Sequence, residues 1–152
     1  MTPFYKSYLD KLTELHNDLA KAIDGLPQAA LDWVPNPEMN SIDVMIFHLT
    51  GAERYWIGDV GSGDPAPRDR AAEFRASGNS VEVLRKRLDD NLAYTRRALE
   101  ALTLQDLEKV VKSPRDGQEF TVAWALLHAM EHTAIHLGHV QLTRQLWDQK
   151  QK

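Results

Sequence analysis

Apolar side chains recur every three or four positions in four long stretches of the chain, which is the spacing of one face of an α-helix. In the first stretch the apolar positions are Tyr8, Leu12, Leu15, Leu19 and Ala22. The chain shows no convincing strand pattern. We therefore predict four amphipathic helices at about 3–24, 41–60, 80–102 and 121–148, which together make an all-α four-helix bundle.

Residues that favour helix ends stand at the expected boundaries. Pro3 suits the first turn of a helix, and Gly25 suits the position just after one. We expect Asn79 to cap the third helix, because Glu82 follows three residues later as in a capping box. We expect Thr121 to cap the fourth helix.

The segments between these helices are rich in turn-forming residues. Residues 25–40 should form a crossover that Trp33 packs against the bundle. Residues 61–79 are long for a connection in a compact bundle. We expect them to be a crossover along the bundle or a functional lid, held down by Phe74. Residues 110–120 should form a loop or a small hairpin.

Length and composition fit one globular domain covering residues 1–152. The net charge is −4 and the basic residues are scattered, so we expect no nucleic-acid partner. The chain has no cysteine, which excludes disulfides, thiolate metal ligands and a cysteine nucleophile. No apolar run approaches the ~20 residues of a membrane span, and no apolar signal region is present. We therefore expect a cytoplasmic protein.

Four histidines share one stripe of the expected fourth helix. At ~100° per residue from His132, His136 falls at about +40° and His139 at about −20°. His128 falls at about −40° on the same scale. Small apolar residues lie in this stripe too, so we expect it to face the core. Two imidazoles four residues apart, His132 and His136, are typical of transition-metal ligands.

A fifth histidine, His48, lies at the margin of the apolar face of the expected second helix. Together with His132 and His136 it would make a three-histidine site for one ion. Neutral imidazoles leave a cation its full charge, and open positions would admit water or substrate. Nitrogen ligands suit zinc, nickel, copper and iron, so these residues alone do not determine the metal.

Two further polar residues lie near the expected core. His16 flanks the apolar stripe of the first helix, and we interpret it as a rim histidine with a wet edge; the alternative is a pocket-lining group. Asn91 lies close to the core face of the third helix. We interpret it as a buried polar group that needs partners, and the alternative is a donor that supports the metal ligands.

Two other kinds of metal site fit poorly. A di-iron carboxylate bundle needs Glu-x-x-His on two helices, and no such motif lies on the core faces here. The run from His128 through Glu131 to His132 matches an inverted zincin motif, but the only acid downstream is Asp148 in a short tail. Glu131 also lies about 100° from His132, away from the ligand stripe.

Three short motifs stand in order along the chain. They are the tract Leu26-Pro27 through Trp33 to Pro35, the pair His48-Leu49 followed by Glu53-Arg54-Tyr55-Trp56, and the run Glu131 to His139. Together they resemble the DinB/YfiT-like superfamily of metalloenzymes over nearly the whole chain. The resemblance implies an up-down-down-up bundle, a homodimer, and a divalent cation, often nickel or zinc, bound by His48, His132 and His136.

A related branch, the mycothiol-dependent maleylpyruvate isomerases, carries Glu where this chain has His132, so this chain resembles the all-histidine branch. His128 and His139 are additional. We expect them to support the ligands from behind or to line the pocket; the alternative is a structural or solvent-facing role.

The resemblance also implies an activity. Characterised members of the superfamily transfer low-molecular-weight thiols such as bacillithiol, mycothiol or glutathione, or isomerise substrates with the help of such a thiol. We therefore expect a metal-activated thiol that attacks a small electrophilic substrate. Two alternatives remain open. One is a hydrolase in which the metal activates water, and the other is a non-catalytic bundle that binds a metal or another ligand.

Overall fold

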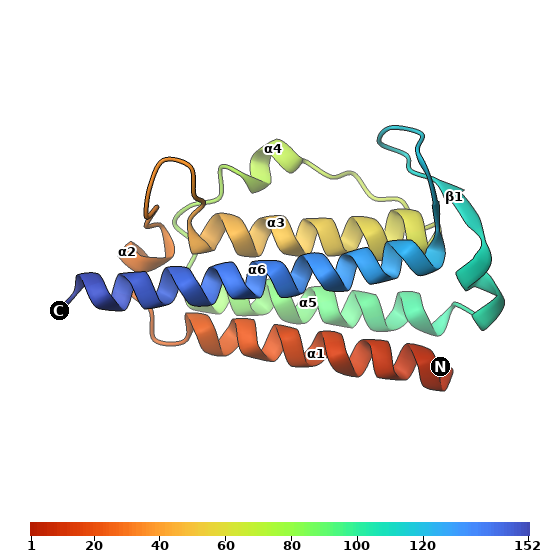
Figure 1. Ribbon diagram of the computed structural model, residues 1–152, viewed down its shortest axis with the longest axis horizontal. Coiled ribbons are helices and arrows are strands. Elements are labelled where there is room, and N and C mark those ends of the chain that lie inside the picture. Colours follow the sequence, from red (N-terminus) through yellow and green to blue (C-terminus); the bar gives the residue numbers. More distant parts are fainter.

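Four long helices form a bundle in the computed structural model, which describes residues 1–152 (Figure 1). They are α1 (Pro3–Ile23), α3 (Ile42–Arg54), α5 (Val81–Glu100) and α6 (Val122–Lys150). Helices α1 and α6 run in one direction, and α3 and α5 run in the other (Figure 1). The predicted four-helix bundle is thus confirmed, with up-down-down-up topology.

Shorter elements connect the long helices. They are α2 (Gln28–Leu31), η1 (Tyr55–Ser62), α4 (Arg70–Glu73), η2 (Leu104–Glu108), β1 (Val110–Lys112) and β2 (Glu119–Thr121). The two strands pair antiparallel, with Val111 opposite Phe120, so residues 110–120 form the small hairpin rather than an open loop. Trp33 packs edge to face on Trp147 with ring centroids 5.6 Å apart, which holds the first connection against α6.

The second long helix changes its winding at Tyr55. Residues Tyr55–Ser62 form a π-helix, whereas the periodicity predicted an uninterrupted α-helix to residue 60. Gly63 ends it with φ +69°, a conformation that favours glycine. Short π-helical turns often lie at functional sites, because they shift the side chains that follow by one position.

The connection from η1 to α5 runs back along the bundle, as the parallel direction of α3 and α5 requires (Figure 1). Its end is fixed by Asp43, which is buried and accepts hydrogen bonds from the backbone and side-chain amides of Asn79. The prediction that Asn79 caps α5 is therefore wrong. Ser80 is the cap, and its hydroxyl accepts from the amide of Val83.

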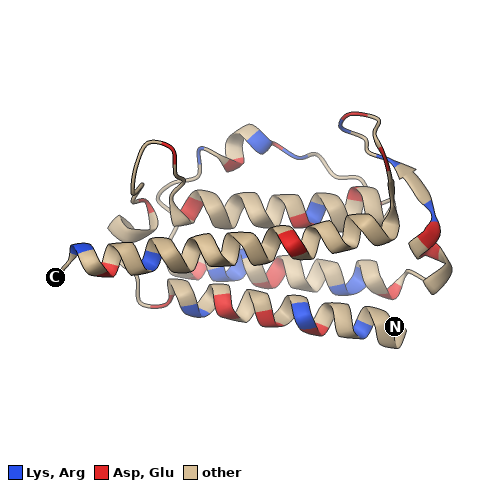
Figure 2. Cartoon of the chain, viewed as in Figure 1, with Lys and Arg blue, Asp and Glu red and all other residues tan.

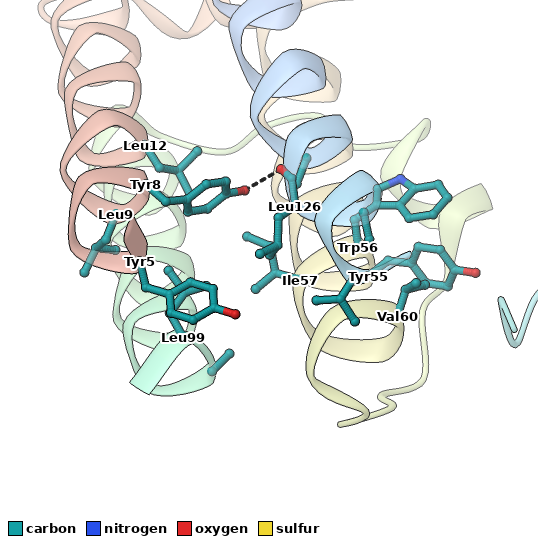
Figure 3. Close-up of a cluster of buried hydrophobic side chains, with 14 of the residues drawn as sticks. Tyr5, Tyr8, Leu9, Leu12, Tyr55, Trp56, Ile57, Val60, Leu99 and Leu126 are labelled. Atoms are coloured by element: carbon teal, nitrogen blue, oxygen red, sulfur yellow. Dashed lines mark hydrogen bonds between the residues drawn. The ribbon is translucent and has the colours of Figure 1, made fainter. Parts of the chain in front are cut away.

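Two apolar clusters fill the two ends of the bundle. The first gathers the start of α1, η1, the end of α5 and the start of α6; in it the hydroxyl of Tyr8 donates to the carbonyl of Leu126 at 2.7 Å (Figure 3). The second gathers the end of α1, α2, the starts of α3 and α5, and Leu137 and Val140 of α6. Removing this apolar surface from water is the main force that holds the helices together.

A layer of polar side chains separates the two clusters. Glu53 is fully buried and accepts from Asn91 Nδ2 at 2.6 Å, Thr133 Oγ1 at 3.1 Å and Thr95 Oγ1 at 3.3 Å. His16 Nε2 lies 2.8 Å from a Glu53 oxygen, and Nδ1 donates to the Leu88 carbonyl. His16 is only 2% exposed, so the prediction of a wet rim histidine is wrong.

The prediction for His16 failed because it could not include the partner of this residue, Glu53. The helical pattern of α1 alone gives no carboxylate for His16, whereas the fold brings Glu53 of α3 against it. Asn91 is the buried polar group that was predicted to need partners, and Glu53 supplies one. None of the helices is both long enough and apolar enough to cross a membrane.

Candidate metal centre

The histidines of α6 lie along one edge of its buried face. The fully buried positions of this helix are Val122, Ala125, Leu126, Ala129, Thr133, Leu137, Val140 and Thr143. His132 and His136 are half-buried and His139 is exposed. The stripe predicted to face the core does so at Ala125, Ala129, Val140 and Thr143, which are buried, whereas its histidines lie at the edge of the buried face. Thr133, about 100° further round the helix, also faces inward, where it donates to buried Glu53.

The rotation of α6 directs its histidines toward α3. One ring nitrogen from each of His48, His132 and His136 lies within 4.8 Å of those of the other two. The ring centroids are 5.0 Å apart for His48 and His132, 5.2 Å for His48 and His136, and 4.5 Å for His132 and His136. The fold thus brings together, from two helices, the three histidines that the sequence singled out, although His48 precedes the other two by more than 80 positions.

His48 is oriented by a carboxylate from the returning connection. Its Nδ1 donates to Glu73 Oε2 at 3.1 Å, which in the neutral ring leaves the lone pair on Nε2. Arg68 holds the same carboxylate with two hydrogen bonds, from Nε to Oε1 at 2.7 Å and from Nη2 to Oε2 at 2.8 Å. A carboxylate behind an imidazole is the usual support of a metal-binding histidine.

A glycine makes this support possible. A Cβ atom at Gly51 would lie 2.0 Å from Glu73 Oε1, so only glycine lets the carboxylate approach α3 so closely. Burial alone would raise the pKa of Glu73, but the hydrogen bonds from Arg68 and His48 hold it below its usual value. Glu73 therefore stays ionised and keeps its hold on both partners.

Two nitrogens of the α6 pair lack partners within the protein. Nδ1 of His132 and Nδ1 of His136 are buried and accept or donate no hydrogen bond. Burial, and then the neighbouring histidines, lowers the pKa of His132 to about 3 and that of His136 to about 4. Both rings are thus neutral at neutral pH, and neutral imidazole is the form that binds metal ions.

His128 and His139 lie at the two ends of the histidine row and outside the three-histidine group. The ring of His128 stacks on Trp124 with centroids 4.7 Å apart and meets the ring of Trp56 edge on at 4.8 Å. His139 is exposed, with its ring centroid 5.7 Å from that of His136. Glu131 is also exposed, lies 3.7 Å from His128 Nδ1, and is not a member of the three-histidine group.

The donor set fits a divalent transition-metal ion. It consists of three nitrogen donors from two helices, of which one is oriented by a carboxylate and two are held neutral. Buried ring nitrogens without a partner cost free energy. A metal ion held by these three rings would take one lone pair from each, and the absence of carboxylate ligands would leave its charge intact.

Sequence reasoning missed Glu73, Arg68 and the role of Gly51. The returning connection was recognised as a crossover or lid, and Phe74 was expected to hold it down. Phe74 does pack on the ring of His48 at 4.7 Å. The one usable signal for Glu73 was that a metal-binding histidine usually needs a carboxylate behind it.

The sequence matches the family described as mycothiol-S-transferase (MST) over residues 8–149. This agrees with the predicted resemblance to the DinB/YfiT-like superfamily. No curated protein matches the chain.

Solved structures share the fold at low sequence identity. A conserved protein of Enterococcus faecalis aligns with a TM-score of 0.76 and 14% identity, covering 96% of this chain and 98% of that one. YfiT from Bacillus subtilis, described as a probable metal-dependent hydrolase with an unusual four-helix bundle topology, aligns with a TM-score of 0.78 and 14% identity over 97% and 90%. A DinB-like protein of Bacillus subtilis aligns with a TM-score of 0.72 and 16% identity over 93% and 92%. At these identities the similarity concerns the fold alone.

Proposed function

Because the chain belongs to the mycothiol-S-transferase family, we propose that it is a metal-dependent enzyme that transfers a low-molecular-weight thiol to a small electrophilic molecule. In this proposal His48, His132 and His136 hold a divalent ion. The observation that carries it is the convergence of three imidazoles from two helices, with two buried nitrogens that have no partner in the protein. Buried polar atoms in a structural core usually have a partner.

A bound ion would supply positive charge that favours the deprotonated form of a nearby thiol. The residues of the chain prepare the site for it. Glu73 keeps the proton of His48 on Nδ1, and Arg68 keeps Glu73 in place. Burial keeps His132 and His136 neutral. The buried face of α6, which includes Thr133 with its hydrogen bond to Glu53, sets the rotation of the helix and with it the direction of both rings.

Nickel and zinc are the metals we propose, since both accept imidazole ligands. Elemental analysis of the purified protein should give about one such ion per chain, as a mononuclear site requires. His132→Ala should lose the ion, whereas His128→Ala should retain it because His128 lies outside the group. Full retention of the ion by His132→Ala would contradict the proposed ligand set.

The thiol is the second part of the proposal, and mycothiol is the first candidate because of the family description. The metal-loaded protein should conjugate an electrophilic aromatic dye to mycothiol, with bacillithiol and glutathione as comparison thiols. His136→Ala should abolish this conjugation. Absence of turnover with every thiol, together with ester hydrolysis that His136→Ala abolishes, would instead favour the hydrolase. A bound metal without either activity would favour a non-catalytic binding protein.

We also propose that two copies of the chain associate. Between Val122 and Thr143 of α6 the only charged residue is Glu131, and most of this helix carries no charge colour in Figure 2. Its exposed apolar side chains include Trp124, Leu127, Ile135 and Leu142. Light scattering at micromolar concentration should give the mass of a dimer; the mass of one chain would contradict this part of the proposal.

A further inference from the structure

A cavity of about 710 Å³ lies on the other side of the Glu73–Arg68 pair from the metal centre. Its walls are α3 with η1, α5, and the connection that returns between them, which follows α3 in Figure 1. None of the three clustered histidines lines it, whereas both Glu73 and Arg68 do. The cavity is therefore a neighbour of the metal centre and separate from it.

The charged side chains around this cavity are paired, with one exception among the cations. The pairs are Arg54 with Asp59, Arg68 with Glu73, and Lys86 with Asp90. Asp69 is exposed and caps α4 through the amide of Ala72. Arg87 is the remaining lining cation, and it forms no salt bridge with any carboxylate of the chain.

Arg87 is held in position although it has no ionic partner. Its Nε donates to Thr50 Oγ1 at 2.7 Å, and its Nη2 donates to the carbonyl of Phe47 at 3.4 Å. Its guanidinium also lies 4.1 Å from the centre of the Phe47 ring. Nη1 makes no hydrogen bond to the protein. Burial lowers the pKa of Arg87, although Glu73 and Asp43 offset part of this effect.

The rest of the wall suits an organic body. Phe47, Ala72, Ala76 and Val83 all line the cavity beside Arg87. A partly buried, oriented cation that forms no salt bridge favours an anion, because a charge-assisted hydrogen bond would offset the cost of its burial. A single unpaired cation matches a single negative charge rather than a phosphate dianion.

We propose that this cavity is a second binding site, which takes a small organic carboxylate with its charge on Arg87 and its apolar part against Phe47 and α4. The site does not depend on the metal centre or on thiol transfer. Its closeness to Arg68 and Glu73 places the carboxylate beside the residues that support His48.

The probe is benzoate, titrated into metal-free protein and followed by amide chemical shifts in nuclear magnetic resonance spectra. Benzoate should bind with saturable shifts on α3 and α5. Arg87→Gln should weaken binding at least about tenfold, the loss expected for one charge-assisted hydrogen bond. The control is Arg96→Gln, which removes an exposed arginine of α5 that lies outside the cavity and should bind as the parent does.

A second variant keeps the test valid if Arg87→Gln folds poorly. Val83 lines the cavity but is 47% exposed, so Val83→Glu should fold and should repel benzoate at least about tenfold through its added charge. Equal benzoate affinity in the parent, Arg87→Gln and Val83→Glu would overturn the proposal. Absence of saturable binding by the parent protein would overturn it as well.

A further control must exclude benzoate binding at the metal centre, since a carboxylate can also approach histidines. His132→Ala should bind benzoate as the parent does, because His132 does not line the cavity. Loss of benzoate binding in His132→Ala with retention in Arg87→Gln would place the carboxylate at the histidines and overturn the proposal. The result of this control bears only on the cavity proposal, and the proposed thiol transfer stands or falls separately.

Discussion

Histidines with opposite surroundings lie in the middle of the bundle. His16 is 2% exposed, and both of its nitrogens have protein partners, in Glu53 and the carbonyl of Leu88. His132 and His136 are half-buried, and each has a buried Nδ1 with no partner. Thr133, which is one residue from His132, donates to the same Glu53 carboxylate that contacts His16.

This difference shows what distinguishes a structural imidazole from an available one. The degree of burial does not, since the more deeply buried ring is the one without a proposed metal role. The partners do, because a ring with two engaged nitrogens has no lone pair to offer. His48 stands between the two cases. Glu73 engages one of its nitrogens and thereby directs the other toward the α6 pair.

The largest effect is expected on the unfolding free energy, in the variant His16→Ala. It leaves the carboxylate of Glu53 buried with one partner fewer, and breaking such a buried pair costs roughly 3–5 kcal/mol of unfolding free energy. Metal content should remain that of the parent protein, because His16 has no part in the three-histidine group. Urea unfolding and elemental analysis measure the two quantities.

A double variant serves as the control for this change. His16→Ala combined with Glu53→Gln removes the unpaired charge, so it should be more stable than His16→Ala alone. If His16→Ala lost its metal while keeping its stability, the division between a structural and a metal-binding set would be wrong.

A smaller effect, on metal affinity, is expected when Glu73, the carboxylate that orients His48, is changed. Glu73→Gln removes the charge that orients this ring, and losing such support typically lowers metal affinity about 10–100-fold. Glu82→Gln is the matched control, since Glu82 is exposed on α5 and far from the histidines in the chain. Affinity is measured by competition with a chelating dye. Equal affinity in both variants would show that Glu73 does not support the site.

Gly51→Ala tests the same contact without changing any charge. The added methyl group would overlap Glu73 Oε1, so the carboxylate must move away from α3. Metal affinity should fall in the same direction as in Glu73→Gln, by about tenfold or less. Unchanged affinity would mean that the carboxylate can support His48 from another position.

The helices and the pairing of His132 with His136 could be predicted because both depend on local spacing. Positions four apart share a face in any helix, whatever it packs against. The direction of that face could not be predicted in the same way. It depends on packing between distant parts of the chain, such as the contact of Thr133 with Glu53, two residues that are 80 positions apart.

The residues that surround the proposed metal ligands were harder still to predict from the sequence. Glu73 comes from an irregular segment 25 positions from His48, and no periodicity relates the two. His16 was predicted at a wet rim because its own helix shows only flanking leucines. Its carboxylate partner lies on another helix, 37 positions away. Hydrogen bonds and ion pairs between different helices and loops therefore could be identified only from the structure.

The smallest effect is expected from pH, and it comes from the α6 pair, His132 and His136. The folded-state pKa values of His132 and His136, about 3 and about 4, lie below the ordinary value of 6.5. The unfolded chain therefore binds more protons below about pH 6.5, and the metal-free protein should lose stability as the pH falls from there toward 4. We expect a loss of about 1 kcal/mol, because both rings are partly exposed and solvent screens them. Urea unfolding in the presence of a chelator measures it, and His132→Gln combined with His136→Gln should flatten the slope relative to the parent. If the unfolding free energy of the double variant falls with pH as steeply as that of the parent, other groups cause the pH dependence and the pKa values of the two rings are not lowered.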